Sequence, residues 1–214
     1  MIKWKSKKKQ PKEHFVAEAP FTNVGEQFRI IRTKILQYQN RTGAKSFLVT
    51  SPSKGEGKSF VTANLAIVFA ELNKKVLILE ANLRNPSVHK YFHKIENAEQ
   101  NQSDIQFPTI YQTNKPNIYI IDHEKLTYNP STFFSNGNLR VAMDILKDQF
   151  DLILVDAPHA INIPELLTLL MNVDSVIGVV NYRKTLKKEW KTFGEIMDSI
   201  GKCDYLTVIN SKNK

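Results

Sequence analysis

The chain has 214 residues and a formal net charge of +9, and hydrophobic residues make up 42% and charged residues 24% of it. This length suits one domain with a sizeable core, or a domain with a tail, and the composition is typical of a globular protein. A single cysteine excludes an internal disulfide and fits a reducing compartment, and no apolar run approaches the roughly 18 residues of a membrane span.

The N-terminal segment is strongly basic. The run MIKWKSKKKQPK contains six lysines, and no apolar segment follows that would make it a secretory signal. We expect residues 1–19 to form a flexible tail attracted to an anionic membrane surface or to an acidic partner. A solvated, disordered terminus is the alternative. Nucleic acid is not an expected partner, because the tail has a lone Trp4 and no arginine to read bases.

Beyond the tail, apolar runs alternate with stretches of helical spacing. The alternation predicts one α/β domain over residues 20–214, with a mostly parallel sheet and helices on both faces. Residues 94–116 are polar, and we expect them to form an irregular surface excursion. Continuous apolar runs, typical of strands covered on both faces, begin near residues 46, 75, 117, 150, 175 and 205. Helical spacing covers residues 23–40, 57–75, 136–150, 162–172 and 186–201.

The first predicted helix carries a charged stripe. Its segment EQFRIIR places Glu26, Arg29 and Arg32 at steps of three, so their side chains lie on one face of the helix. Taken alone, this spacing indicates a ladder of ion pairs on the helix surface.

The segment VTSPSKGEGKSF follows the first predicted strand and opens the next helix. Gly55 and Gly57 allow the backbone to curl and point its N–H groups inward, and the helix N-terminus adds a partial positive charge. Lys58 can reach the outer phosphates of a nucleotide, and the Ser59 hydroxyl can bind Mg²⁺. Pro52 stands where the usual pattern has its first glycine. We expect the nucleotide to contact Ser53, Lys54, Gly55, Glu56, Gly57, Lys58, Ser59 and Phe60.

The next predicted strand ends in polar side chains, in the segment VLILEANLRNP. Glu80 and Asn82 are two residues apart, so we expect both to face the same side of the strand end. Arg84 follows two residues later, and Pro86 would stop the strand. Taken alone, the segment is also compatible with a turn that caps a helix.

A later strand ends in a carboxylate. In FDLILVDAP, four apolar residues lead to Asp156. A carboxylate at the C-terminal edge of a central strand lies beside bound phosphates and can hold Mg²⁺ through water. The alternative is an aspartate that caps the following turn.

Together these motifs resemble those of the bacterial tyrosine kinases of capsule and exopolysaccharide synthesis, a branch of the deviant P-loop ATPases. The resemblance covers about residues 20 to 210 and includes the Asn-Pro stretch NPSTFFSNGNLRVAMDIL. It implies a three-layer P-loop fold that binds ATP or ADP with Mg²⁺ and transfers the γ-phosphoryl group of ATP to a tyrosine hydroxyl. It assigns catalysis to Lys58, Glu80, Asn82, Arg84 and Asp156, and metal binding to Ser59, Asp156 and Glu80. It places Asn210 near the adenine.

The resemblance also implies partners and a location. In the family, the stripe of Glu26, Arg29 and Arg32 joins subunits into a ring. Relatives without a membrane span dock on the cytoplasmic tail of a separate transmembrane adaptor, a polysaccharide co-polymerase. The expected location is therefore cytoplasmic, at the inner face of the plasma membrane.

The chain departs from the family pattern in its second motif and after its last strand. Glu80 and Asn82 replace two aspartates, and no tyrosine follows Tyr205, where relatives have a tyrosine cluster. His159 replaces a second proline after the third motif, and Glu165 replaces a later aspartate. Besides a kinase, the sequence therefore admits a degenerate nucleotide-binding regulatory subunit. A partitioning or positioning ATPase is disfavoured, because Ser53 stands where that class has its signature lysine.

Overall fold

The computed structural model describes residues 16, 22–100, 109–121, 138–161 and 165–211. Within these residues, no helix is both long enough and apolar enough to cross a membrane. Apart from Val16, the predicted tail lies outside the described residues, as does the Asn-Pro stretch before residue 138. Val16 is buried against the core, and its N–H donates a 2.8 Å hydrogen bond to Asn64 Oδ1. The predicted division into a tail and one domain stays a prediction.

The described strands form one eight-stranded sheet in the order β3-β4-β5-β2-β6-β1-β7-β8. The six neighbouring strands β5, β2, β6, β1, β7 and β8 pair in parallel. Strand β4 pairs antiparallel with both β3 and β5. The strands are β1 (Ser46–Thr50), β2 (Val76–Glu80), β3 (Lys94–Gln100), β4 (Ile110–Thr113), β5 (Ile118–Ile121), β6 (Leu152–Asp156), β7 (Ser175–Asn181) and β8 (Leu206–Asn210). The helices are α1 (Asn23–Thr42), α2 (Lys58–Ala70), the 3₁₀ helix η1 (Val88–Tyr91), α5 (Asn138–Gln149), α6 (Glu165–Met171) and α7 (Lys187–Ser199).

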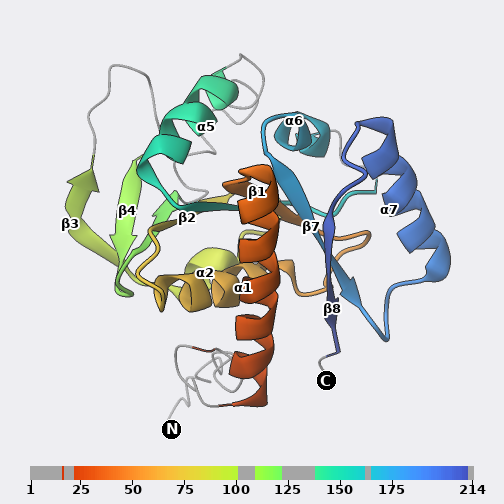
Figure 1. Ribbon diagram of the computed structural model, residues 1–214, viewed down its shortest axis with the longest axis horizontal. Helices are drawn as coiled ribbons and strands as arrows, with labels where there is room; N and C mark the ends of the chain where they lie inside the picture. The colour runs from red at the N-terminus through yellow and green to blue at the C-terminus, as the bar shows by residue number, and fades with distance from the viewer. Residues whose placement is uncertain (1–15, 17–21, 101–108, 122–137, 162–164, 212–214) are drawn as a thin grey trace, which may run out of the picture.

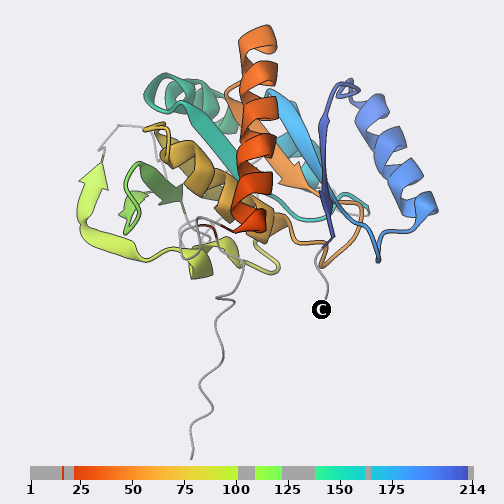
Figure 2. The ribbon, with the colours of Figure 1, turned by 60° about the horizontal axis from the view of Figure 1, so that its bottom comes forward.

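Helices cover both faces of the sheet, which gives three layers (Figures 1 and 2). Helices α1 and α2 pack on one face, around buried residues such as Phe47 and Phe69. Helices α5, α6 and α7 pack on the other, around residues such as Leu48 and Phe193. Because neighbouring residues of a strand point to opposite faces, Phe47 and Leu48 belong to different cores. The predicted α/β fold with a mostly parallel sheet is confirmed.

Helix α2 packs against both α1 and the central strands of the sheet. Its residues from Val61 to Phe69 are buried without interruption, as expected for a helix that is apolar all round. Helix α1 is the longest helix described, and Figure 1 shows it crossing in front of the sheet with α2 behind it. The Thr22 hydroxyl accepts the N–H of Gly25 at its start, and Gly43 ends it with a φ of 75°. The N-terminus of α2 lies at the end of the central strand β6, where Ser59 Oγ donates to Asp156.

Residues 94–116 differ from the prediction. They contain β3 and β4, which extend the sheet beyond β5 instead of forming an irregular excursion. The polar composition of this segment obscured the two strands, because strands at the edge of a sheet are exposed more than central ones.

The register of the parallel strands brings their carboxyl ends together. Glu80 of β2 lies opposite Asp156 of β6, and Asn181 of β7 lies opposite Asn210 of β8. In Figure 1, β7 and β8 both run toward the lower edge of the sheet, where the label C marks the end of the chain. In open α/β sheets this edge is where ligands bind.

Candidate functional site

The phosphate loop connects β1 to α2 and depends on two glycines. Gly55 and Gly57 have φ values of 78° and 98°, in the left-handed region that other residues rarely adopt. A Cβ on Gly57 would overlap the side-chain amide of Asn210, so this position has no room for a larger residue. Gly57 also precedes the first residue of α2, so the loop ends at a helix N-terminus that favours anions.

Lys58 is buried at the start of α2. Its Nζ donates a 3.1 Å hydrogen bond to Ser51 Oγ, and its residual exposure is 7%. Burial lowers the pKa of Lys58, while the carboxylates of Asp156 and Glu56 act in the opposite direction. A buried ammonium with so few partners is well placed to gain a phosphate oxygen.

Asp156 lies at the centre of the site. Ser59 Oγ donates a 2.6 Å hydrogen bond to its Oδ2, and Thr62 Oγ1 lies 3.4 Å from its Oδ1. Burial raises the pKa of Asp156 to about 7, although Ser59 and Lys58 favour its charged form. Ser87 completes the arrangement, because its hydroxyl lies 2.7 Å from Ser59 Oγ.

These oxygens fit a magnesium ion that is shared with a nucleotide. Mg²⁺ usually binds through one or two carboxylates together with phosphates and water, and Ser59 with Asp156 supplies such a partial set. Within the described part of the chain, no cluster of three or more His, Cys, Asp or Glu residues suits a metal held by protein alone. The ligand set therefore needs phosphate oxygens to complete it.

Glu80 lies opposite Asp156 on the neighbouring strand, and its carboxylate is engaged by the turn that begins η1. Its Oε1 accepts the N–H groups of Ser87 and Val88 at 2.7 and 2.8 Å, and its Oε2 lies 2.9 Å from Nδ1 of His89. The side chain is fully buried. Here the carboxylate holds the first turn of η1, a contact that sequence spacing did not reveal. Its role as a metal ligand stays a prediction.

The other residues of the second motif spread apart. Strand β2 ends at Glu80, so the expected alternation does not continue to Asn82, whose amide donates to the Asn85 carbonyl at 3.1 Å. Arg84 is exposed, and its charge helps to lower the pKa of His159, after burial and the charges of Lys58 and Lys54.

A segment far along the chain braces the phosphate loop. Thr185 Oγ1 donates a 2.7 Å hydrogen bond to Glu56 Oε1, and the ammonium group of Lys184 donates to the Lys54 carbonyl. Ser53 Oγ donates to Glu189 Oε1 at 2.7 Å. The segment between β7 and α7 thus contacts two of the predicted nucleotide-binding residues, and Glu189 in the first turn of α7 contacts a third. No local sequence motif predicted these contacts.

The opposite end of the loop borders a pocket of about 300 Å³. Asn210 lines it and donates a 2.9 Å hydrogen bond from Nδ2 to the Glu56 carbonyl. Phe60 also lines the pocket and packs edge-on against Phe28. The lining residues come from α1, α2 and β8, and their aromatic and amide groups suit a planar base. The predicted position of Asn210 beside a base is compatible with this geometry.

Comparison with known proteins now identifies the family. A family model described as ATPase MipZ matches residues 46–181. The tyrosine-protein kinase YwqD of Bacillus subtilis is 30% identical over 169 residues, which are 77% of this chain and 71% of YwqD. The chain belongs to the bacterial tyrosine-kinase family of P-loop ATPases. The predicted family is therefore confirmed.

Further similarities point to the same tyrosine-kinase family. The EpsB protein of Ralstonia solanacearum is 29% identical over 189 residues, which are 86% of this chain but only 24% of EpsB. The chain thus spans about a quarter of some of its relatives. The chain is also similar to the crystal structure of the chimerical protein CapA2B2, with 25% sequence identity and a TM-score of 0.79. The superposition covers 93% of this chain and 89% of the CapA2B2 chain.

The stripe that the family resemblance assigned to ring assembly lies on α1, away from the phosphate loop. Arg29 pairs with Glu71 at 2.8 Å and with Glu26 at 2.8 Å, and Arg32 pairs with Glu71 at 3.2 Å. Arg32 also donates to the Val68 carbonyl. Both arginines therefore bind the C-terminal end of α2 in the same chain, and their predicted role between subunits stays a prediction.

Proposed function

We propose that this chain is an ATP-dependent protein-tyrosine kinase of a capsular or exopolysaccharide synthesis machinery. The observation that carries the proposal is the joint placement of Lys58, Ser59 and Asp156, with Ser59 Oγ 2.6 Å from Asp156 Oδ2, at a glycine-containing loop. The names of the relatives support the acceptor class, since YwqD is a tyrosine-protein kinase.

In the proposed reaction, the acceptor's phenolic oxygen attacks the γ-phosphorus of ATP. The bond between the γ-phosphorus and the bridging β–γ oxygen breaks, and ADP leaves with that electron pair. The phenolic proton passes to a carboxylate. Asp156 is the carboxylate that contacts Ser59 beside the phosphate loop, and we propose it as the group that receives this proton.

The chain's own groups supply positioning and charge. Backbone N–H groups of the phosphate loop would hold the β-phosphate, and Lys58 would neutralise charge that develops on the outer oxygens. Mg²⁺, when bound by Ser59 and Asp156, supplies electrophilic charge to the phosphates. The pocket beside Phe60 and Asn210 would receive the base.

The test is transfer from γ-labelled ATP in the presence of Mg²⁺ and protein acceptors. Lys58→Met should lower tyrosine labelling by about 10²- to 10³-fold, the usual effect of removing one charge-stabilising donor. Lys34→Met, on the exposed side of α1, is the matched control and should label as the unsubstituted protein does. Absence of labelling by the unsubstituted protein, with ADP binding intact, would rule out the kinase.

A second candidate function is a nucleotide-binding regulatory subunit without kinase activity. The observation that favours it is the second motif, where Glu80 is engaged by the Ser87–His89 turn and Asn82 bonds to Asn85. With both groups occupied, Asp156 would be the carboxylate that binds the Ser59 hydroxyl at the metal position. The same labelling experiment separates the two candidates.

The proposal includes an adaptor and a location. We infer that the chain acts at the inner face of the plasma membrane, where it would bind the cytoplasmic tail of a transmembrane polysaccharide co-polymerase. The basic N-terminal residues support attraction to an anionic surface. Assembly into a homo-oligomeric ring through α1 belongs to the same proposal.

A further inference from the structure

A second pocket opens on the other side of the phosphate loop. It has a volume of about 410 Å³ and is lined by the loop, by the segment after β6 and by the first turns of α7. This volume lies within the range of sites that bind small molecules or side chains. The lining residues are Ser53, Lys54, His159, Ile161, Lys188, Glu189 and Thr192.

The two pockets lie at opposite ends of the loop. Phe60 and Asn210 line the first, whereas Ser53 and Lys54 line the second. The outer phosphates of a bound nucleotide would lie beside Lys58 and Asp156. His159, which follows Asp156 by three residues and is close enough to Lys58 for that charge to act on it, lines the second pocket. The second pocket therefore borders the place where a γ-phosphate would be transferred.

The second pocket combines positive charge with apolar surface. Lys54 and Lys188 line it, and Arg84 is close enough for its charge to act on His159. The carboxylate of Glu189 is engaged, since it accepts from Ser53 Oγ at 2.7 Å and from the Leu186 N–H at 2.9 Å. Within the described part of the chain, no salt bridge involves either lining lysine.

The apolar part of the pocket comes from one short segment. His159 and Ile161 come three and five residues after the end of β6, and both residues line the pocket. An aromatic ring packs well against such surfaces, and anionic groups beside that ring would meet the lysines.

We propose that this second pocket binds the phosphate acceptor and selects tyrosines that are flanked by acidic residues. The inference rests on the proposed kinase function and names its substrate class: a protein segment in which aspartate or glutamate neighbours the tyrosine. Lys188 would contact the acidic flank, while Ile161 and His159 would contact the ring.

The test measures peptide binding, so that it does not depend on phosphoryl transfer. A fluorescent peptide with a tyrosine between glutamates is titrated with the ADP-loaded full-length protein, and its anisotropy is recorded. Lys188→Glu should weaken binding about tenfold, because an attraction becomes a repulsion. ADP affinity should not change. A glutamate suits the first turn of a helix, so the variant should fold.

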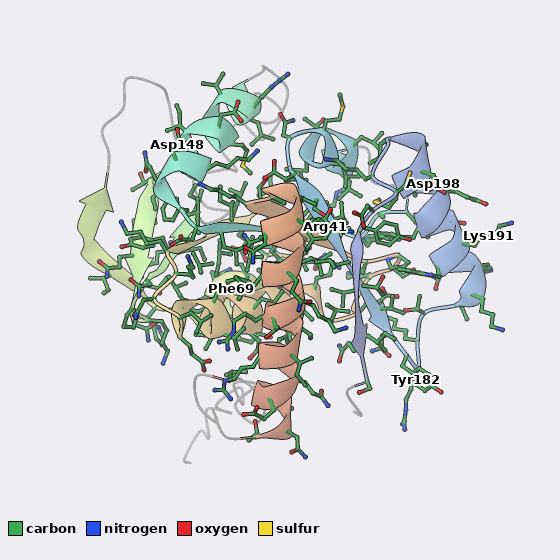
Figure 3. All side chains as sticks on the ribbon, viewed as in Figure 1. Arg41, Phe69, Asp148, Tyr182, Lys191 and Asp198 are labelled. Atoms are coloured by element: carbon green, nitrogen blue, oxygen red, sulfur yellow. The ribbon has the colours of Figure 1, made fainter. Side chains whose placement is uncertain are left out.

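Lys191→Glu is the matched control. Lys191 lies on the same helix, its side chain is 81% exposed, and Figure 3 shows it on the outer side of α7. This variant should bind the acidic peptide as the unsubstituted protein does. A peptide with lysines flanking the tyrosine should bind at least about tenfold more weakly than the acidic one, and an acidic peptide with serine in place of tyrosine should also lose affinity.

Three results would overturn the proposal. They are equal effects of Lys188→Glu and Lys191→Glu, equal affinity for the acidic and the lysine-flanked peptide, and no effect of replacing the tyrosine. If selective binding fails while labelling of tyrosine proceeds, the pocket is refuted and the kinase stands. If selective binding holds while labelling is absent, the kinase is refuted and the site is an acidic-peptide pocket without transfer.

Discussion

Asp156 is a fully buried carboxylate that accepts a hydrogen bond from the Ser59 hydroxyl and lies within electrostatic reach of Lys58. Burial raises its pKa to about 7 from the ordinary value of 3.8, so the folded chain keeps a proton there that the unfolded chain has lost by pH 5. Folding stability therefore falls as pH rises from about 4 to about 7, and the loss persists at higher pH. In a functional site such a cost is expected, because a bound cation would favour the charged form.

Asp156→Asn should remove this cost. In the absence of nucleotide, we expect the variant to be more stable than the unsubstituted chain at pH 8 by about 2 kcal/mol, with the difference vanishing near pH 4. Urea unfolding at the two pH values measures the effect. If the variant were destabilised equally at both pH values, the raised pKa of Asp156 would be contradicted.

Asp151→Asn gives a control of opposite sign. Burial opposes the charged form of Asp151, but hydrogen bonds from the Lys75 N–H and from Lys74 outweigh it and lower the pKa of this carboxyl. Its stabilising effect is present at neutral pH and is lost as pH falls through the folded pKa. Because the folded pKa lies below the ordinary value of 3.8, this variant should lose stability at both pH 8 and pH 4, and the loss should fade only at pH values below 3.8.

At the scale of elements, the stripe on α1 has a partner in its own chain. Arg29 and Arg32 both reach Glu71 just beyond α2, where the three side chains are partly exposed. Such pairs typically contribute up to about 1 kcal/mol each. The stripe can therefore stabilise the packing of α1 on α2, and the same arginines are the ones that the family resemblance places between subunits.

Two variants separate these roles. Arg29→Ala with Arg32→Ala should lower stability to urea by about 1 kcal/mol and, if the arginines join subunits, should also reduce the assembly size. Glu71→Gln breaks the same intrachain pairs but keeps both arginines, so it should lower stability without reducing the assembly. Light scattering and urea unfolding provide the two measurements. Equal assembly sizes for the double variant and the unsubstituted protein would refute the interface.

Sequence patterns predict the secondary-structure elements well where a segment is continuously buried. They predict contacts between residues that are far apart in the chain less well. The central strands, α2 and the phosphate loop were predicted because apolar runs and glycines are local signals. Strands β3 and β4 were missed, because their segment is polar and lies at the sheet edge. The contacts of Glu80 with η1 and of Thr185 with Glu56 depend on how loops fold back, which spacing alone does not encode.

At the scale of the whole molecule, positive charge is concentrated at the N-terminus. Six lysines precede residue 13, and the chain as a whole carries +9. Each lysine near an anionic bilayer contributes about 1 kcal/mol, and salt screens that attraction. Membrane binding of this kind would concentrate the chain beside the adaptor that we propose as its partner.

Replacing these six lysines with glutamine should abolish binding to vesicles that contain phosphatidylserine. The unsubstituted protein should bind at low salt and dissociate as the salt concentration rises, because the attraction is electrostatic. Vesicle sedimentation measures both proteins, and neutral phosphatidylcholine vesicles serve as the control. Binding that persists in the glutamine variant would assign the attraction to another surface.

The brace between β7 and α7 has a consequence for regulation. Lys184, Thr185 and Glu189 all touch the phosphate loop, and α7 forms the outer edge of the molecule beyond β8 (Figure 1). A displacement of this edge helix would therefore alter the cradle for the phosphates. By thermodynamic reciprocity, a protein that binds α7 more tightly when the nucleotide is present must tighten nucleotide binding by the same factor.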